Sequence, residues 1–317
     1  MVKSRPVVIA HRGAPGYLPE HTLPSKALAY AMGADFLEQD VVATRDDELV
    51  VLHDIYLDRV SDVNDRYPDR ARADGRYYVR DFDLAELRRL QVSERRQADG
   101  SAVYASRFPP NTGNFGIHTF AEELEFLDAL NASTNGNVDC YPEIKRPAWH
   151  REQGVDITTL FLQTLQAFAY EEKPHAVFVQ CFDADELIRI RKELGCRLPL
   201  VQLIGENAWG EGPSDFEELR TKGGLKKLAD TVDAIGPSLL QLYHLREGTP
   251  IATKLCTDAR ETGLDVHPYT FRKDELPPGF DSFKSLIDFA LDSLRVNGMF
   301  TDFADVVRAE VDDRAYN

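Results

Sequence analysis

Residues 7–42, VVIAHRGAPGYLPEHTLPSKALAYAMGADFLEQDVV, decide the fold. The stretch opens with a short apolar run, Val7–Ala10, and closes with a second β-rich run, Asp35–Val42. Between them, Thr22–Met32 has the apolar spacing of an amphipathic helix, and Thr22 is a good N-cap for it. Strand, helix and strand in this order indicate one βαβ unit of a parallel sheet.

The same alternation continues along the whole chain. Eight β-rich runs are expected to form strands: Val7–Ala10, Asp35–Val42, Val138–Lys145, Ala176–Cys181, Pro199–Ile204, Asp233–Pro237, Asp265–Phe271 and Gly298–Phe303. Amphipathic stretches are expected to form the helices: Thr22–Met32, Phe120–Leu130, Val155–Tyr170, Asp183–Leu194, Phe216–Thr231, Pro250–Thr262, Ser282–Arg295 and Phe303–Asp313. Eight strand–helix pairs predict an α/β fold of the (β/α)8, or TIM-barrel, type. A doubly wound open sheet is the alternative, because the fifth helix and the short sixth strand have the weakest patterns.

One long gap interrupts this rhythm after the second strand. Residues Asp54–Ile117 are too many for a single crossover helix, and they are polar and rich in Arg and Asp. We therefore expect one domain over residues 1–317 that carries an inserted segment at about 54–117. Because the insertion follows a barrel strand, it should overhang the face where barrel active sites lie.

Composition limits the classes of partner. The chain has 37 Lys and Arg against 53 Asp and Glu, which gives a formal charge of −16. This acidic balance disfavours binding to nucleic acid or to an anionic membrane surface. A phosphate-bearing substrate must then be held by local positive charge, either a metal ion or a few placed Lys and Arg. The 43% of apolar residues is enough for the core of a soluble globular protein.

The cysteines and the N-terminus carry little functional signal. Four widely spaced cysteines form no CxxC pair, so we expect buried free thiols: Cys140, Cys181, Cys196 and Cys256. The chain contains no run of about 18 apolar residues, so stable membrane insertion is not expected. The first strand begins too close to Met1 for a signal peptide, so the chain is either cytoplasmic or a mature periplasmic or secreted form with an added Met. A homodimer is left open.

Two histidines stand where a barrel places catalytic groups. His11, followed by Arg12, comes directly after the first strand, and His53-Asp54 follows Leu49–Leu52, which should extend the second strand as a hairpin. One imidazole could remove a proton while the other delivers one to a leaving oxygen. Taken alone, an isolated His-Arg pair such as His11-Arg12 favours a role in loop packing or capping over a catalytic one.

Two carboxylates share one face of the second strand. Side chains alternate along a strand, so Glu38 and Asp40 point to the same side and Gln39 to the other. Two carboxylates inside a barrel are costly to desolvate, and a cation with oxygen ligands, Ca²⁺ or Mg²⁺, would remove that cost. The alternative is that the pair ends the strand in water.

The third strand offers a further acidic group and a cation. Glu143 and Lys145 share a face, and the second and third strands are neighbours in a barrel. Glu143 could therefore complete a three-carboxylate site, while Lys145 supplies local positive charge. An inward Glu143–Lys145 ion pair is the competing structural interpretation.

The remaining six histidines are assigned no chemistry. Four are expected in loop or surface contexts: His118, His150, His175 and His244. His267 is expected to pack in the seventh strand. His21 lies near His11 and Arg12, and its role is left open.

Taken in order, the motifs closely resemble the glycerophosphodiester phosphodiesterase family. They are His11-Arg12-Gly13, Pro19-Glu20-His21-Thr22, Glu38-x-Asp40, His53-Asp54, Pro142-Glu143-Ile144-Lys145, Gln180-Cys181-Phe182-Asp183, His267-Pro268-Tyr269-Thr270 and Phe300-Thr301-Asp302-Phe303. The resemblance spans nearly the whole chain and implies a (β/α)8 barrel with an insertion after its second strand. His21, where many members carry Asn, resembles the periplasmic or secreted bacterial branch. Tyr269 stands where many cytosolic members carry Trp, which leaves substrate contacts at that position open.

The resemblance also implies a mechanism and residue roles. It implies that His11 and His53 are the acid–base pair. It implies a divalent-metal site, with Ca²⁺ expected ahead of Mg²⁺, formed by Glu38, Asp40 and Glu143. It also implies a phosphate clamp formed by Arg12 and Lys145, and a further substrate contact at Tyr269. The substrate would be a small glycerophosphodiester, cleaved to sn-glycerol 3-phosphate and an alcohol such as choline, ethanolamine or glycerol. Two alternatives stay open: a lipid phosphodiesterase of the phospholipase C or D type, and a barrel that binds glycerophosphodiesters without cleaving them.

Overall fold

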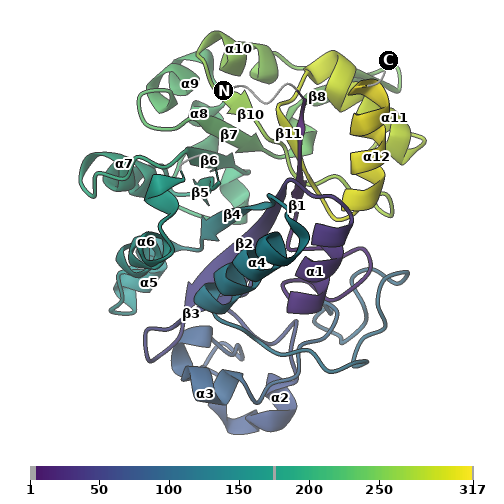
Figure 1. Ribbon diagram of the computed structural model, residues 1–317. Coiled ribbons are helices and arrows are strands. Elements are labelled where there is room, and N and C mark those ends of the chain that lie inside the picture. The colour runs from purple at the N-terminus through teal and green to yellow at the C-terminus, as the bar shows by residue number, and fades with distance from the viewer. Residues whose placement is uncertain (1–4, 174–175, 316–317) are drawn as a thin grey trace.

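Eight parallel strands form the centre of the computed structural model, which describes residues 5–173 and 176–315 (Figure 1). They are β1 (Val7–Ala10), β2 (Phe36–Ala43), β4 (Asp139–Ile144), β5 (Val179–Cys181), β6 (Leu200–Ile204), β7 (Ala234–Pro237), β10 (Asp265–Val266) and β11 (Gly298–Thr301). Their order is β10-β7-β6-β5-β4-β2-β1-β11. Backbone hydrogen bonds then close the ring between its two end strands, Asn297 N to Val266 O at 2.9 Å and Phe300 N to Pro268 O at 3.1 Å. The predicted (β/α)8 barrel is confirmed.

Helices surround these strands (Figure 1). They are α1 (Leu23–Ala31), α4 (Phe120–Thr134), α5 (Pro147–Glu152), α6 (Ile157–Ala167), α7 (Ala184–Lys192), α8 (Phe216–Leu219), α9 (Lys222–Leu228), α10 (Leu255–Glu261), α11 (Phe283–Asp288), continued as a π-helix over Phe289–Leu294, and α12 (Ala304–Ala315). Thr22 caps α1 as expected, because its side chain accepts a hydrogen bond from Ser25 N. None of the helices described is both long and apolar enough to cross a bilayer.

Two predicted helices differ from the structure. The helix expected over Phe216–Thr231 is two helices, because Thr221 caps a new one, α9, directly after α8 ends. The helix expected over Pro250–Thr262 begins only at Leu255, since its first residues pair as strand β9 (Thr249–Ala252) with β8 (Tyr243–Arg246). The turn of that hairpin is Glu247-Gly248, and both residues have positive φ, as a two-residue turn of type I′ requires.

Two of the remaining histidines are not on the surface. His118 is buried before α4, and His150 is fully buried in α5. The His150 ring accepts a hydrogen bond from Ala43 N at 3.2 Å through Nε2. Burial lowers the pKa of His150 to about 4, so it packs as a neutral ring. His244 is exposed and His267 is buried, as expected, whereas His175 lies outside the described residues.

The insertion and β2 share an apolar cluster, to which β2 contributes Val42. After β2, β3 (Leu49–Val51) pairs antiparallel with it, and the chain then passes through α2 (Val63–Arg66) and α3 (Leu84–Leu87) before α4. Figure 1 shows α2 and α3 projecting from the barrel below β3. Buried side chains of this segment pack on one another: Ile55, Leu57, Val60, Val63, Tyr77, Val79, Phe82, Leu87, Leu90, Val92 and Ile117.

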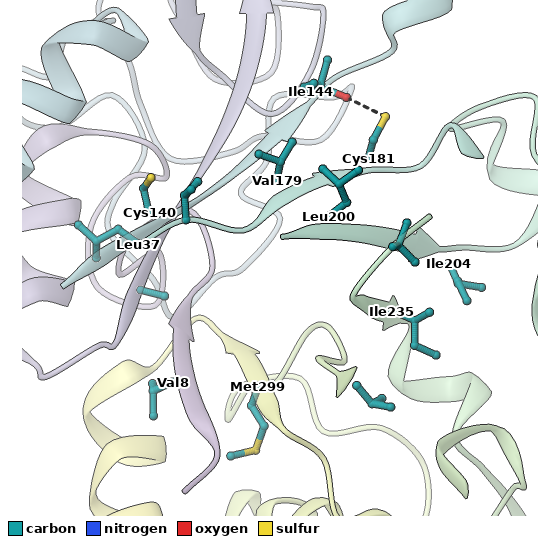
Figure 2. Close-up of a cluster of buried hydrophobic side chains, with 14 of the residues drawn as sticks. Val8, Leu37, Cys140, Ile144, Val179, Cys181, Leu200, Ile204, Ile235 and Met299 are labelled. Carbon is teal, nitrogen blue, oxygen red and sulfur yellow. Dashed lines mark hydrogen bonds between the residues drawn. The ribbon is translucent and has the colours of Figure 1, made fainter. Parts of the chain in front are cut away.

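The strand pleat sorts side chains into two layers. Val8 and Leu37 belong to the large apolar layer between strands and helices, which also holds Cys140 and Ile144 (Figure 2). Their neighbours in sequence face the barrel interior, where seven buried apolar side chains fill the space: Val7, Ile9, Phe36, Tyr141, Val201, Ala234 and Phe300. The free cysteines Cys140, Cys181, Cys196 and Cys256 are buried, as predicted. The same parity sends Glu38 and Asp40 inward and Gln39 outward.

The outward Gln39 joins a buried ionic network that ties β2 to two helices. Lys26 of α1 lies 2.8 Å from Glu123 Oε1 of α4, and both side chains are completely buried. Gln39 Nε2 donates to Glu123 Oε1 at 2.9 Å, and His118 Nε2 lies 2.7 Å from Glu123 Oε2. Burial opposes ionisation of Glu123, but the Lys26 charge and the His118 bond outweigh it and lower its pKa to about 2. The strand that carries the acidic residues is thus held from behind by a charged pair.

Removing one member of this pair should destabilise the barrel strongly. Lys26→Met leaves Glu123 charged and buried, and should lower the free energy of unfolding by about 3–5 kcal/mol at neutral pH. Adding Glu123→Gln should recover part of the loss. The deficit should persist above about pH 4.3, the ordinary Glu pKa, and shrink as the pH falls toward 2. Urea unfolding followed by circular dichroism measures it.

The matched control is Lys222→Met, because Lys222 pairs with Glu261 on the surface, where both side chains are more than half exposed. That change should cost less than about 1 kcal/mol. Equal losses for Lys26→Met and Lys222→Met would contradict a structural role for the buried pair.

Candidate active site

The turn after β1 brings His11 and Arg12 to the mouth of the barrel. Arg12 and Gly13 both have positive φ, 57° and 98°, and a Cβ on Gly13 would lie 2.8 Å from Ser25 Oγ. The chain can reverse here because glycine tolerates this geometry. The reversal points Arg12 N at Glu38, to whose Oε2 it donates at 2.7 Å.

Three buried carboxylates lie together at the same mouth. Ligand oxygens of Glu38, Asp40 and Glu143 lie within 4.8 Å of one another. Glu38 accepts further from Gln180 Nε2 at 3.0 Å, and Asp40 Oδ2 lies 2.6 Å from His21 Nε2. Asp40 Oδ1 is buried without a hydrogen-bond partner. The sequence placed these three carboxylates side by side, and the fold brings them together.

The close approach of the three carboxylates gives them different pKa values. Burial and the neighbouring Asp40 charge raise the pKa of Glu38 to about 8. Burial also raises the pKa of Glu143, against the pull of Lys145. For Asp40, burial is outweighed by Lys145 and His21, and its pKa lies well below the ordinary value. Without a cation, the three acidic groups therefore carry fewer than three negative charges between them. A bound cation would lower the raised pKa values and favour the ionised form of all three.

Two cations border the carboxylates. Lys145 Nζ lies 2.7 Å from Glu143 Oε1 and 3.9 Å from Asp40 Oδ1, so the inward ion pair considered for the sequence is present. Arg12 Nη1 donates to Glu20 Oε2 at 3.0 Å, and its Nε lies 3.8 Å from Asp40 Oδ2. Arg12 follows β1 and Lys145 follows β4, the two parallel strands that pair with β2.

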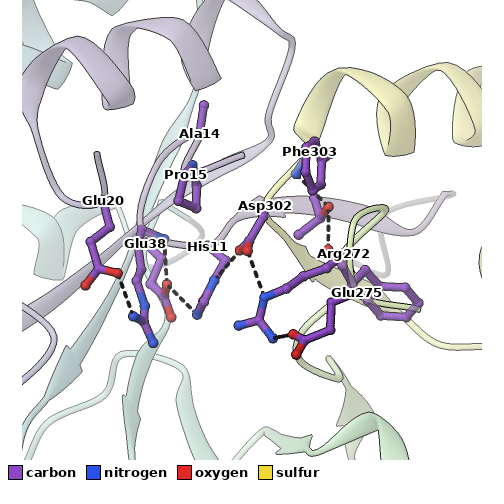
Figure 3. A network of polar contacts seen from close by, with 12 residues as sticks. His11, Ala14, Pro15, Glu20, Glu38, Arg272, Glu275, Asp302 and Phe303 are labelled. Atoms are coloured by element: carbon purple, nitrogen blue, oxygen red, sulfur yellow. Dashed lines mark hydrogen bonds and ion pairs between the residues drawn. The ribbon is translucent and has the colours of Figure 1, made fainter. Parts of the chain in front are cut away.

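His11 is held by a carboxylate from the last strand. Its Nδ1 lies 2.6 Å from Asp302 Oδ1, and its Nε2 lies 3.9 Å from Glu38 Oε2 (Figure 3). Asp302 Oδ2 also accepts from Arg272 Nε at 2.8 Å. Burial and the Arg12 charge lower the pKa of His11 to about 4, although Asp302 opposes them.

His53 repeats this arrangement with the aspartate that follows it in sequence. Its Nδ1 lies 2.7 Å from Asp54 Oδ1, and the ring is half-buried. Burial, then Arg12 and Lys145, lower the pKa of His53 to about 3. Each predicted histidine thus has one ring nitrogen bound to an aspartate, which leaves Nε2 to face other groups.

Two adjoining pockets share both histidines. One, of about 230 Å³, is lined by the carboxylates and by the aromatic side chains Phe182, Trp209 and Tyr269. The other, of about 190 Å³, is lined by barrel loops and by insertion residues that include Val103 and Tyr104. His11, Arg12, His53 and Arg272 line both pockets.

The fold adds contacts that the sequence pattern did not assign. His21 binds Asp40, Asp302 orients His11, and Gln180 holds Glu38. Gln180, Asp302 and Arg272 lie in or directly after the expected fourth, eighth and seventh strands, so their position at strand ends was an available signal. Tyr269 lines the pocket, but its hydroxyl donates to Ile204 O at 2.9 Å, so only its ring is free for a ligand.

Comparison with known proteins agrees with this geometry. The sequence profile of the glycerophosphoryl diester phosphodiesterase family matches residues 11–306. A glycerophosphodiester phosphodiesterase of Haemophilus influenzae is 41% identical over 324 aligned residues, which cover 96% of this chain and 89% of that protein.

Two solved structures have the same fold. One is a crystal structure described as a putative glycerophosphoryl diester phosphodiesterase from Silicibacter pomeroyi, with a TM-score of 0.73 and 21% identity over 99% of this chain and 95% of that one. The other is a phosphodiesterase from Oleispira antarctica in complex with the product sn-glycerol-3-phosphate, with a TM-score of 0.62 and 19% identity over 97% of each chain. With the profile match and the Haemophilus relative, the barrel and its carboxylate cluster show that this chain belongs to the glycerophosphoryl diester phosphodiesterase family of hydrolases.

Proposed function

We propose that the chain hydrolyses glycerophosphodiesters, such as glycerophosphocholine and glycerophosphoethanolamine, to sn-glycerol 3-phosphate and an alcohol. The observation that carries the proposal is that two aspartate-bound histidines, His11 and His53, line one pocket with three clustered carboxylates. The product bound to the Oleispira relative and the name of the Haemophilus relative support the substrate class.

The two histidines act as the acid–base pair in this proposal. Asp302 and Asp54 each accept from an Nδ1–H, which fixes the tautomer that keeps a lone pair on Nε2. Both rings have pKa values below the ordinary 6.5 in the free enzyme, so near neutral pH both are uncharged and each has a lone pair that can accept a proton. A bound phosphodiester anion favours the imidazolium form of a nearby ring, so the second histidine can hold the proton it must give.

Proton movements then balance over the reaction. One imidazole takes the proton of the attacking hydroxyl, a new P–O bond forms, the P–O bond to the alcohol breaks, and the other imidazole protonates the departing oxygen. If the glycerol 2-hydroxyl attacks first, a cyclic phosphate forms, and the imidazoles exchange roles when water opens it. The sum is one diester and one water converted into sn-glycerol 3-phosphate and an alcohol.

Glu38, Asp40 and Glu143 would hold a divalent cation, Ca²⁺ ahead of Mg²⁺. An all-oxygen donor set, the buried Asp40 Oδ1 without a hydrogen-bond partner and the raised pKa of Glu38 all fit such an ion. When bound, the ion supplies charge neutralisation at the phosphoryl oxygens. Arg12 and Lys145 would clamp the same oxygens.

The remaining walls would set substrate preference. The Tyr269 ring would contact substrate beside the carboxylates, since its hydroxyl is already bonded to the backbone. We further propose that residues 1–317 work as one domain, in which the segment at about 54–117 forms the wall against the alcohol. Val103 and Tyr104 in the second pocket support this placement.

Chelation should abolish turnover if the carboxylates hold an essential ion. After EDTA treatment and dialysis, release of glycerol 3-phosphate from glycerophosphocholine should fall to background and return on adding Ca²⁺, with a smaller return for Mg²⁺. Glu143→Gln should weaken both metal binding, measured by calorimetry, and turnover. Full activity in protein shown to be metal-free by elemental analysis would refute the ion's role.

Loss of either histidine should affect kcat far more than KM. His11→Ala and His53→Ala should each lower kcat for glycerophosphocholine by about 10²–10⁴-fold, the usual contribution of a positioned proton-transfer group. An activated nitrophenyl ester needs no protonated leaving group, so it should partly rescue the variant that lacks the acid and not the one that lacks the base. Near wild-type rates for both variants would rule out the two-histidine mechanism.

A charge placed at Val103 should change selectivity among alcohol groups. Val103→Glu should raise kcat/KM for glycerophosphocholine relative to glycerophosphoglycerol, and Val103→Lys should lower it, because the choline group is cationic. The ratio should move up to about tenfold, the equivalent of 1.4 kcal/mol. If both variants keep the wild-type ratio, the insertion does not face the alcohol.

A further inference from the structure

The insertion contributes one arginine to each histidine–aspartate pair. Arg107 Nη2 donates to Asp302 Oδ2 at 2.7 Å, while the other oxygen of Asp302 binds His11. Arg95 Nη1 donates to Asp54 Oδ2 at 2.7 Å, while the other oxygen of Asp54 binds His53. Each set forms a relay, which is a chain of guanidinium, carboxylate and imidazole: Arg107–Asp302–His11 in one and Arg95–Asp54–His53 in the other.

Each arginine is fixed by a second carboxylate from a barrel loop. Arg95 Nε and Nη2 donate to the two oxygens of Glu20 at 2.9 and 2.6 Å. Arg107 Nε and Nη2 donate to the two oxygens of Asp274 at 2.8 and 3.1 Å. A planar guanidinium can hold two carboxylates at once in fixed directions, which an ammonium group cannot do. The arginine side chains are only 14% and 3% exposed, so water competes little for these bonds.

The relay has a clear effect on the imidazoles. An aspartate with one oxygen bound to a guanidinium stays ionised and cannot rotate, so its other oxygen keeps accepting from Nδ1–H. That bond holds Nε2 of the ring in one direction, as outer partners of active histidines generally do. Without the arginine, the aspartate could turn or take a proton, and the ring would lose its orientation.

We propose that Arg95 and Arg107 are positioning residues for His53 and His11, so that the inserted segment builds the acid–base pair as well as bordering it. The proposal rests on the two-histidine function proposed above. It also predicts an asymmetry. Asp302 Oδ2 accepts from Arg272 as well as from Arg107, whereas Arg95 is the arginine that binds Asp54 in the structure described.

The test uses the full chain with its divalent ion and compares four variants on glycerophosphocholine. Arg95→Met should lower kcat by about 10–100-fold with little change in KM, and Arg107→Met should lower it less, because Arg272 remains. Arg95→Lys should recover only part of the loss. Arg72→Met is the matched control, because Arg72 binds both oxygens of Asp81 within the insertion and lines neither pocket of the site. The kcat of this variant should not change.

A double variant separates positioning from general support of the fold. If Arg95 acts through His53, adding Arg95→Met to His53→Ala should lower kcat by less than about twofold more. A full multiplicative loss in the double variant, or unchanged kcat in Arg95→Met, would overturn the proposal. Should Arg95→Met fail to fold by circular dichroism, Arg95→Lys replaces it in the same comparison. Failure of the two-histidine function itself would be seen separately, as an unaffected kcat in His53→Ala alone.

Discussion

Compensation of buried negative charge is the constraint on which the rest of the site depends. The pleat turns Glu38, Asp40 and Glu143 toward one point inside a barrel, where unpaired charge is expensive. Backbone and side-chain donors meet them from several elements: Arg12 N from the turn after β1, His21 from the loop before α1, Gln180 from β5 and Lys145 after β4. One oxygen, Asp40 Oδ1, has no hydrogen-bond partner. An acidic chain thus concentrates its few inward cations where a phosphate would need them.

Compensation of buried charge also joins the insertion to the barrel. A buried guanidinium is stable only when it is paired, and Arg95 and Arg107 each bind two carboxylates of the site. Moving the insertion away from the barrel would therefore leave charges unpaired on both sides. The segment shares an apolar cluster with β2, and its polar edge is joined to the loops that follow β1 and β10. It is better described as part of the site wall than as a free lid.

Local pattern was enough to predict what depends on one or two strands. Period-two alternation placed Glu38 and Asp40 on one face and Glu143 beside them, and the alternation of strands and helices predicted the barrel. Features that depend on long-range packing were not predictable. Arg95 binds Glu20 across 75 positions and Arg107 binds Asp302 across 195, and nothing near either arginine marks it. His150 resembled a surface residue because its only local signal is polarity, whereas its partner is the distant Ala43 backbone. The β8–β9 hairpin was missed because a helical pattern follows it directly.

The bond between His11 and Asp302 spans 291 positions, from the end of the first strand to the end of the last. The ribosome makes the chain from its N-terminus, so His11 is synthesised early. Its partner Asp302 is added only when nearly the whole polypeptide has been made. The imidazole acquires its orientation only when β11 pairs with β1 and the ring closes. Nascent or C-terminally truncated chains therefore lack an oriented His11, so the proton transfer proposed for this ring requires the completed barrel.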